Sequence, residues 1–375
     1  MKLVVNCSEL SGMLSRLQGF LGRSDLSPIL SNVLIQAGEG GQVSLSATDN
    51  EISFKGTISA QVHTAGAITV NGKRLLAMVR QFPSSEVTLE ISDRDELSLT
   101  SGRSHMVLMG IDAREFPEFS LGSDDEGYML RGGVLTDLFE RTLFSSSTDE
   151  ARPNLNGVLF ASLGDGVIRV VSTDGHRLSL AERYAGVEGS ATISAFDGQI
   201  IPRKAVTELR KLLDEYPEVR LSLSGQSLIV KTPDFGVSVR LIAERFPPYE
   251  AVIPKSNENV FIFDRKVLLD ALKRMGLVGE EKLHGVKLEF QGSEVSLESK
   301  NSNLGQVSEV ITLEEGSSDH AMLISFGVTY MIDVLNAIKG AEVHLHLDQT
   351  SSTPGLFKDP EFEQDIFVVM PKKIV

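Results

Sequence analysis

Tryptophan is absent from the 375 residues, and cysteine occurs only once, at Cys7. A single cysteine cannot form a disulfide within the chain and excludes a metal site built from several cysteines. No run of about 18 apolar residues occurs, so we expect no membrane-spanning segment. The first residues carry no basic segment followed by an apolar one, as a secretion signal would, and this indicates a cytoplasmic protein.

Positive charge and aromatic residues are also scarce. The chain has 36 Lys and Arg against 51 Asp and Glu, a net charge of −15, which excludes a generally basic nucleic-acid-binding coat but leaves a local basic patch possible. Aromatic residues make up 6%, which argues against a surface that stacks unpaired bases. The chain lacks the GxxxxGK[ST] phosphate loop and the GxSxG nucleophile motif, so these motifs give no reason to expect a catalytic residue, a cofactor or a metal.

What the sequence does contain is a three-fold internal repeat. Three apolar segments centred on Val33, Val158 and Val286 stand 125 and 128 residues apart, and each leads through a Gly-containing turn into a second strand. Phe116-Pro117, Phe246-Pro247 and Met370-Pro371 close the three blocks, 130 and 124 residues apart. We predict three copies of one domain, at 1–125, 126–255 and 256–375, with linkers at 123–127 and 254–259.

Each block is expected to hold two units of a strand, a helix and several antiparallel strands, which makes an α+β fold. The 3.6-residue spacing of apolar side chains predicts helices at 8–20, 73–82, 134–146, 203–213, 264–275 and 327–339. These segments carry a net charge of +7, so the rest of the chain carries −22. We therefore expect a basic helical surface that meets a polyanion on an otherwise acidic body; DNA would be contacted through phosphates, without sequence preference.

Three other classes stay open at this point. Asp174 and His176 lie in one turn, as in a hydrolase, although the matching Thr48-Asp49 of the first block favours a shared turn structure. A repeat scaffold that does not bind DNA is the second alternative. His344 and His346 on one strand face are the third, a metal site, with solvated strand positions as the plainer interpretation.

The C-terminus offers a candidate surface for a peptide. Segment 367–370 has the pattern of a buried strand, and Pro371 follows it. A final core strand with a frayed tail explains this pattern. Met370, flanked by apolar residues and proline, is also typical of an adaptable surface that accepts a peptide partner.

Several motifs together resemble the bacterial DNA polymerase III beta subunit family, the DNA sliding clamps, over essentially the whole chain. The most specific are Ser27–Asn32, Leu155–Phe160, Thr173–Leu178, Ile201–Lys204, Arg245–Tyr249 and Val368–Pro371. The resemblance implies a head-to-tail homodimer that closes into a ring of six clamp domains, with helices lining the hole and sheets outside. It implies a processivity factor that encircles double-stranded DNA without catalysis. The implied partners are the DNA polymerase III alpha subunit, the clamp-loader complex, and other polymerases and repair proteins that carry clamp-binding motifs.

The resemblance also implies roles for individual residues. The family's partner-peptide pocket maps onto Leu155, Thr173, Gly175, His176, Arg177, Leu178, Pro247, Val252, Ser352, Val368, Val369, Met370 and Pro371. The chain departs from the family at Ala251, where Arg is frequent, and at Thr350, where an aliphatic residue is common, so motif preference is expected to differ. DNA contacts map onto Arg23, Lys73, Arg74, Arg203 and Lys204.

The implied ring interface joins Arg103, Met106 and Leu108 of one subunit to Leu277, Val278 and Glu309 of the other. This chain has Asn303 and Gln306 where some members have a denser acidic cluster. We therefore hypothesise that the interface depends more on apolar burial and strand pairing than on ion pairs.

Overall fold

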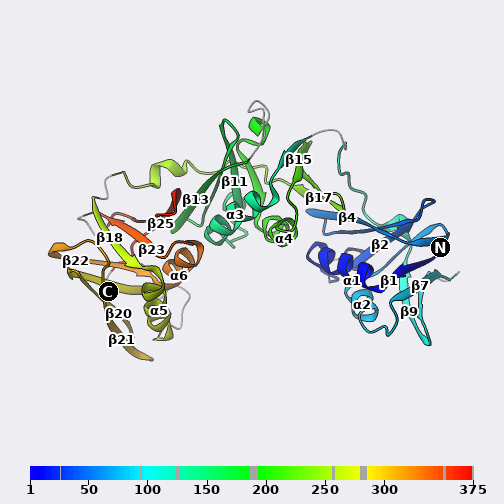
Figure 1. Ribbon diagram of the computed structural model, residues 1–375, viewed down its shortest axis with the longest axis horizontal. Coiled ribbons are helices and arrows are strands. Elements are labelled where there is room, and N and C mark those ends of the chain that lie inside the picture. The colour runs from blue at the N-terminus through cyan, green and yellow to red at the C-terminus, as the bar shows by residue number, and fades with distance from the viewer. Residues whose placement is uncertain are drawn as a thin grey trace. The chain divides into compact units, whose positions relative to one another are not determined.

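The computed structural model describes residues 1–25, 27–92, 95–123, 127–185, 193–255, 258–278, 285–348 and 352–373. The chain forms two compact units, Met1–Gly133 with Glu208–Leu241 and Val134–Thr207 with Ile242–Val375. Figure 1 labels the elements of both units. The predicted linkers at 123–127 and 254–259 lie partly outside the described residues.

Within the described ranges, six α-helices form where the apolar spacing predicted them. They are α1 (Cys7–Arg16), α2 (Gly72–Val79), α3 (Gly132–Thr142), α4 (Arg203–Leu213), α5 (Arg265–Met275) and α6 (Val328–Ala337). Short polar side chains start three of them directly after a strand. The side chain of Asn6 accepts from the N–H groups of Ser8 and Glu9, and Asn71 and Asp264 cap α2 and α5 in the same way.

The first unit is built on one long antiparallel sheet. Its order is β10-β15-β16-β17-β4-β3-β2-β6-β9-β8-β7-β1-β5. In chain order these strands are β1 (Lys2–Asn6), β2 (Asn32–Ala37), β3 (Gln42–Thr48), β4 (Ile52–Ser59), β5 (Gln61–Thr64), β6 (Gly66–Asn71), β7 (Glu86–Ile91), β8 (Glu96–Ser101), β9 (Ser104–Ile111), β10 (Tyr128–Leu130), β15 (Val219–Ser224), β16 (Ser227–Lys231) and β17 (Phe235–Arg240). Helix α1 packs beside α2 within this unit.

The second unit holds two antiparallel sheets, ordered β14-β11-β12-β13-β25-β24-β23-β18 and β21-β20-β19-β22. The strands are β11 (Gly157–Gly164), β12 (Val167–Thr173), β13 (Arg177–Tyr184), β14 (Gln199–Pro202), β18 (Asn259–Asp264), β19 (Gly285–Gly292), β20 (Glu294–Asn301), β21 (Gly305–Thr312), β22 (Ser318–Gly327), β23 (Glu342–Leu347), β24 (Gly355–Asp359) and β25 (Phe362–Val369). Helix α5 packs beside α6.

Strand order confirms the predicted three-fold repeat. Each block contributes four strands in the same pattern, as β4-β3-β2-β6, β13-β12-β11-β14 and β21-β20-β19-β22. Each block also contributes a second set of four strands in one shared order. The sets are β9-β8-β7-β1 in the first block, β17-β16-β15-β10 in the second and β25-β24-β23-β18 in the third. The chain therefore runs six times through strand, helix and three strands, with β5 as an insertion in the first block.

Two junctions of one kind join strands of successive blocks. Strand β4 pairs antiparallel with β17, and β13 pairs antiparallel with β25. In both cases the last strand of one block's first half meets the last strand of the next block's second half. The middle block is therefore divided between the two compact units, each half extending the sheet of a neighbouring block.

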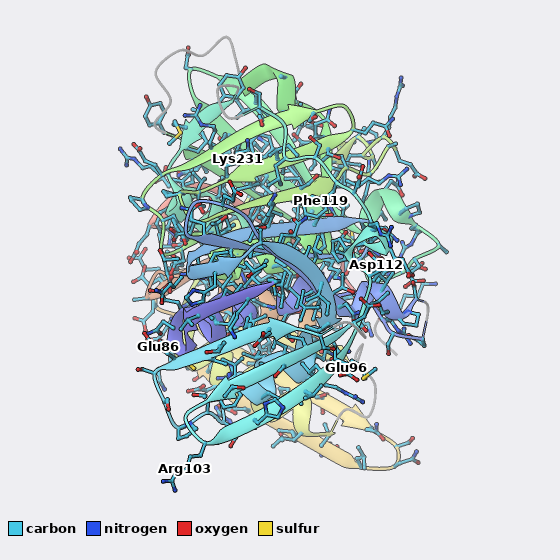
Figure 2. All side chains as sticks on the ribbon, turned by 90° about the vertical axis from the view of Figure 1, so that its right-hand side faces the viewer. Glu86, Glu96, Arg103, Asp112, Phe119 and Lys231 are labelled. Carbon is cyan, nitrogen blue, oxygen red and sulfur yellow. The ribbon has the colours of Figure 1, made fainter. Side chains whose placement is uncertain are left out.

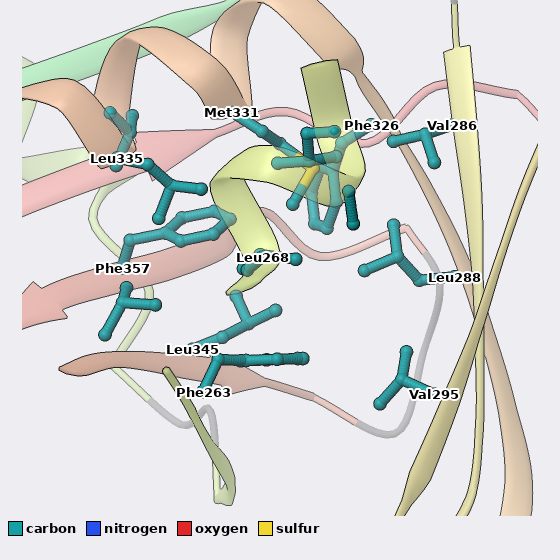
Figure 3. Packing of buried hydrophobic residues seen from close by; sticks show 14 of the residues in the cluster. Phe263, Leu268, Val286, Leu288, Val295, Phe326, Met331, Leu335, Leu345 and Phe357 are labelled. Carbon is teal, nitrogen blue, oxygen red and sulfur yellow. The ribbon is translucent and has the colours of Figure 1, made fainter. Parts of the chain in front are cut away.

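The cores consist of the helical faces that the sequence predicted. In the third block, Leu268, Leu272 and Met275 of α5 pack with Met331 and Leu335 of α6, all of them buried. Figure 3 shows Leu268, Met331 and Leu335 among the phenylalanines of the surrounding strands. Burial of this apolar face stabilises the block by roughly 2 kcal/mol for each large side chain.

Across the described stretches of the chain, none of the helices has both the length and the apolar character needed to span a membrane.

Candidate partner pocket and DNA-contact residues

Pairing of β13 with β25 brings together two predicted pocket segments that are almost 200 residues apart in sequence. Arg177 lies opposite Val369, and Leu178 lies opposite Val368. Beyond the last strand pair, the N–H of Met370 donates to the carbonyl of His176 at 2.9 Å. The backbone therefore fixes Met370 next to the turn at 173–176.

That turn is built by its own polar side chains. Thr173 Oγ1 donates to the carbonyl of Arg177 at 2.6 Å, and Asp174 Oδ1 accepts from the N–H groups of His176 and Arg177 at 2.8 and 3.1 Å. Gly175 has a φ of +89°, a conformation that glycine adopts without strain. Thr48 and Asp49 make the equivalent bonds in the first block, which confirms that the Thr-Asp pair serves a shared turn.

The side chain of Arg177 is mostly buried and makes hydrogen bonds to three other parts of the chain. Its guanidinium bonds to Asp174 Oδ2 at 3.1 Å, to Asp333 Oδ2 at 2.6 Å and to the carbonyl of Phe144 at 2.7 Å. It also lies 4.6 Å from the ring centroid of Tyr330. Burial, together with the negative charge of Asp174, raises the pKa of Tyr330. The side chain thus ties the turn to α6 and to the segment after α3.

The short helix that ends at Leu155 connects the turn to the segment around Pro247. Arg152 Nη1 donates to the carbonyl of Asp174 at 3.0 Å, and Asn154 Nδ2 donates to the carbonyl of Arg245 at 3.4 Å, so the short helix ending at Leu155 lies between the turn and the segment that contains Pro247. Tyr249 is buried in one cluster with Leu178 and Val368.

The predicted pocket residues fall into two groups, those whose side chains are buried and those whose side chains reach the surface. Leu155, Thr173, Leu178, Val368 and Val369 are buried and hold the shape of the site. Met370 is 39% exposed and Val252 48%, so both apolar side chains are accessible from solvent. Gly175, His176 and Ser352 are exposed, and Pro247 and Pro371 are half-buried. Ala251 is exposed, whereas Thr350 lies outside the described residues, as do Leu283 and His284 of the third repeat motif.

A buried ion network on α3, β13, β24 and β25 adjoins this region and was not predicted from the sequence. Arg141 of α3 is fully buried and bonds to Asp365 at 2.6 Å and Asp359 at 3.1 Å. Arg183 bonds to Asp365 at 2.6 and 3.0 Å and to Asp137 at 2.8 Å. Burial opposes the charged form of Asp137, but the bond from Lys339 and the charges of Arg183 and Arg141 lower its pKa overall. The network joins α3 to β24 and β25.

The predicted DNA contacts differ in their freedom to reach a phosphate. Lys73 and Arg74 are exposed on α2, and Lys204 is exposed on α4. Arg23 is exposed and pairs with Asp25 at 3.0 Å. Arg203, by contrast, is half-buried, and its Nη1 donates to the carbonyls of Leu143 and Ser146 at 2.9 and 3.1 Å.

The helices keep the predicted excess of positive charge with their observed bounds. From α1 to α6 the net charges are 0, +2, −1, +3, +3 and −1, a total of +6 within a chain of −15. The basic residues of α4 and α5 dominate this total.

Of the predicted interface residues, Met106 and Leu108 lie on β9 and Glu309 lies on β21. Arg103 precedes β9, and Leu277 and Val278 lie in the short helix that follows α5. Between Ser104 and Met109, β9 pairs only with β8 among the described strands, and β21 pairs only with β20. Figure 2 shows Arg103 at the turn that leads into β9. Leu108 and Val278 are buried within their own blocks, whereas Met106 is half-buried.

Sequence reasoning missed the outward-facing neighbours of these residues. Met109 is 69% exposed on β9, and Val310 is 59% exposed on β21, near the exposed Leu277. Because side chains alternate along a strand, the two-residue period of β9 identifies Val107 and Met109 as one face. Glu309 is held by Arg274 of its own chain, at 2.7 and 2.5 Å.

The alternative chemistries find little support in the geometry. The carboxylate of Asp174 accepts from backbone N–H groups and from Arg177, and the hydrogen bond that His176 donates to it comes from the backbone N–H, not from the imidazole. Within the described part of the chain, no three His, Cys, Asp or Glu side chains gather as a metal site requires, so His344 and His346 stand without a third ligand there. Burial and the charge of Glu86 raise the pKa of the Cys7 thiol, the opposite of thiolate activation.

Comparison with known proteins agrees with this arrangement of repeats. Residues 1–120, 129–248 and 250–373 match the N-terminal, central and C-terminal domains of the DNA polymerase III beta subunit. The beta sliding clamp of Pseudomonas putida is 31% identical over 360 residues, covering 95% of each chain.

Two solved structures cover the whole chain. The Caulobacter crescentus beta sliding clamp, crystallised with polyethylene glycol at a putative β-motif tethering region, has a TM-score of 0.92 and 31% identity and is itself covered to 99%. The Bartonella birtlesii sliding clamp bound to griselimycin has a TM-score of 0.92 and 30% identity, with 100% of both chains covered. The repeats define a three-block clamp fold. The chain belongs to the DNA polymerase III beta subunit family, the beta sliding clamps.

Proposed function

We propose that two copies of this chain close head to tail into a ring that encircles duplex DNA and tethers replication proteins to it. The observation that carries the proposal is the recurring junction between blocks, β4 with β17 and β13 with β25. The first halves of the three blocks end in β4, β13 and β21, and the second halves end in β9, β17 and β25. Neither β21 nor β9 takes part in these two junctions, and each has an open edge among the described strands. Pairing β21 of one copy with β9 of the other, twice, closes six blocks into a ring.

The chemistry of the two edges supports apolar association. Val310 and Leu277 on one side and Met109 and Val107 on the other present exposed apolar side chains next to the open backbone edges. Glu309 has its carboxylate satisfied within its own chain, so it has no need of a cation from the partner subunit. The dimer is therefore expected to tolerate rising salt, and a dimer that dissociated steeply with salt would contradict this assignment.

DNA is held by enclosure, and the basic helices supply weak contacts. Lys73, Arg74, Lys204 and Arg23 are assigned to phosphates, which gives mobile, sequence-independent contact that permits sliding. Arg203 is assigned instead to the packing of α4 against the turn at 143–146, given its bonds there.

The pocket around Met370 binds the linear motifs of partner proteins. A peptide's apolar side chains contact Met370 and Val252, above the buried Leu178 and Val368. A partner held in this way stays at high effective concentration near its template, which is the physical basis of processivity. The polymerase alpha subunit, the clamp loader, other polymerases and repair proteins compete for this site.

The protein makes and breaks no bond in this proposal and acts in the cytoplasm. The sequence carries no nucleotide-binding loop, so a separate loader ATPase opens the ring. The domain bounds stay as predicted, at 1–125, 126–255 and 256–375.

The test is topological. Protein loaded onto a nicked circular plasmid should stay bound through gel filtration and be lost after the circle is cut once. The variant V310D, with a charge on the β21 face, is the matched control and should not be retained on either form. Equal retention on circular and linear DNA would refute enclosure.

A further inference from the structure

A surface cavity of about 420 Å³ lies on strands β10, β15 and β16 of the first unit, and none of the residues assigned above lines it. Met129 of β10 lies opposite Arg220 of β15, and Arg220 lies opposite Lys231 of β16. Directly opposed residues point to the same face of a sheet, so these three line the cavity as one row. Figure 2 labels Lys231 on this sheet.

Tyr216 forms one wall of the cavity, and contacts within the protein hold this wall in place before any ligand binds. The hydroxyl of Tyr216 donates to Asp234 Oδ2 at 2.7 Å, and its ring lies edge-on to Phe235 with centroids 5.4 Å apart. Burial and the bond to Asp234 raise the pKa of Tyr216 to about 12, so the ring stays neutral. The N–H of Gly132 donates to the carbonyl of Pro217 at 3.3 Å. A ligand would therefore meet a preorganised wall.

Arg220 is the side chain in this cavity that we expect to bind a ligand. Its side chain is half-buried, and the part of the chain that the structure describes offers its guanidinium no hydrogen bond or ion pair. Lys231, by contrast, donates to the carbonyls of Gly122 and Ser123. Met129, 41% exposed, adds an adaptable apolar contact at the end of the row.

We propose that this cavity binds a short acidic segment of a partner protein, with one carboxylate on Arg220 and an adjacent aliphatic side chain on Met129. A guanidinium binds a carboxylate through two parallel hydrogen bonds, which suits a half-buried site. Glu218 lines the cavity, and Asp234 lies directly beside Tyr216. A nucleic-acid strand would bring successive phosphates against these carboxylates, whereas a single side-chain carboxylate need meet only Arg220.

The site is separate from the pocket around Met370, and its test is independent of ring formation. Full-length protein labelled with ¹³C at the methionine methyl groups would be titrated with N-acetyl-Leu-Asp-Leu-amide, and M129L identifies the Met129 signal. We expect a saturable shift of the Met129 methyl and no shift with N-acetyl-Leu-Asn-Leu-amide. R220Q should weaken binding about ten-fold or more, as loss of a charge-assisted bond does. R240Q, at an exposed arginine of the same sheet, should leave it unchanged.

Several results would overturn the proposal. They are equal shifts with the Asp and Asn peptides, unchanged affinity in R220Q, or no Met129 shift with the acidic peptide. A stronger Met129 shift with oligothymidylate than with the peptide would assign the cavity to nucleic acid instead. The thermal midpoint of R220Q should equal that of the parent protein, and a lower midpoint would show that the guanidinium has a structural partner.

Discussion

Replacing the charged side chain of Asp365 with a neutral one should strongly lower the free energy of unfolding. Its buried carboxylate accepts bonds from Arg141 and from both terminal nitrogens of Arg183. In the network, Arg141, Arg183 and Lys339 balance the carboxylates of Asp137, Asp359 and Asp365. D365N removes one negative charge and leaves a buried positive excess. Breaking a buried pair costs about 3–5 kcal/mol, and asparagine can still accept one bond, so we expect about 3 kcal/mol.

The measurement is urea unfolding followed by circular dichroism. With a slope of about 1–3 kcal/mol per molar urea, the midpoint for D365N should fall by roughly 1 M or more. The control is E363Q, an exposed carboxylate on the same strand, which should change stability by less than about 0.5 kcal/mol. A loss below about 1 kcal/mol in D365N would show that the network is not a buried, coupled unit.

Three further predictions concern the pocket, pH and the DNA contacts. M370D should weaken binding of a polymerase motif peptide at least ten-fold by isothermal titration while sedimentation shows an unchanged dimer; normal peptide binding would refute the pocket. Burial, with repulsion from Lys358 and His344, lowers the pKa of His346, so the unfolded chain binds more protons below about pH 6.5. The stabilising contribution of neutral His346 is therefore complete above that pH and is lost as the pH falls through the pKa of His346 in the folded protein. H346Q should flatten this pH dependence of the urea midpoint. An unchanged dependence of the urea midpoint on pH would count against this role of His346. The double variant K73Q/R74Q should reduce the salt dependence of duplex binding by about two released counterions in a filter assay, whereas an unchanged slope would place α2 away from DNA.

The repeat and its helices were predictable because apolar spacing acts locally. Leu268, Leu272 and Met275 recur at 3.6-residue intervals, and such a face must be buried whatever lies opposite. The turn at Thr173 was predictable for the same reason, since its bonds stay within five residues.

Long-range pairing explains what the sequence did not reveal. Arg141 meets Asp365 across 224 residues of chain, and nothing near either residue marks the partner. The family resemblance places Leu108 at the interface, and its side chain is buried within its own block; which face of a strand is buried reverses with a shift of one position, so it depends on the register of long-range pairing. Arg203 was assigned to DNA from its motif, whereas its bonds to carbonyl groups depend on how α4 packs.

The junction of β13 with β25 has a consequence for fragments of this protein. Residues Arg177–Leu180 find their second set of ladder partners only in Ile366–Val369. A chain terminated near residue 255 would keep β13 but leave that side bare, with Leu178 and Leu180 beside unsatisfied amides. Such a bare strand recruits other copies, so a shortened product would tend to aggregate instead of folding as a smaller clamp.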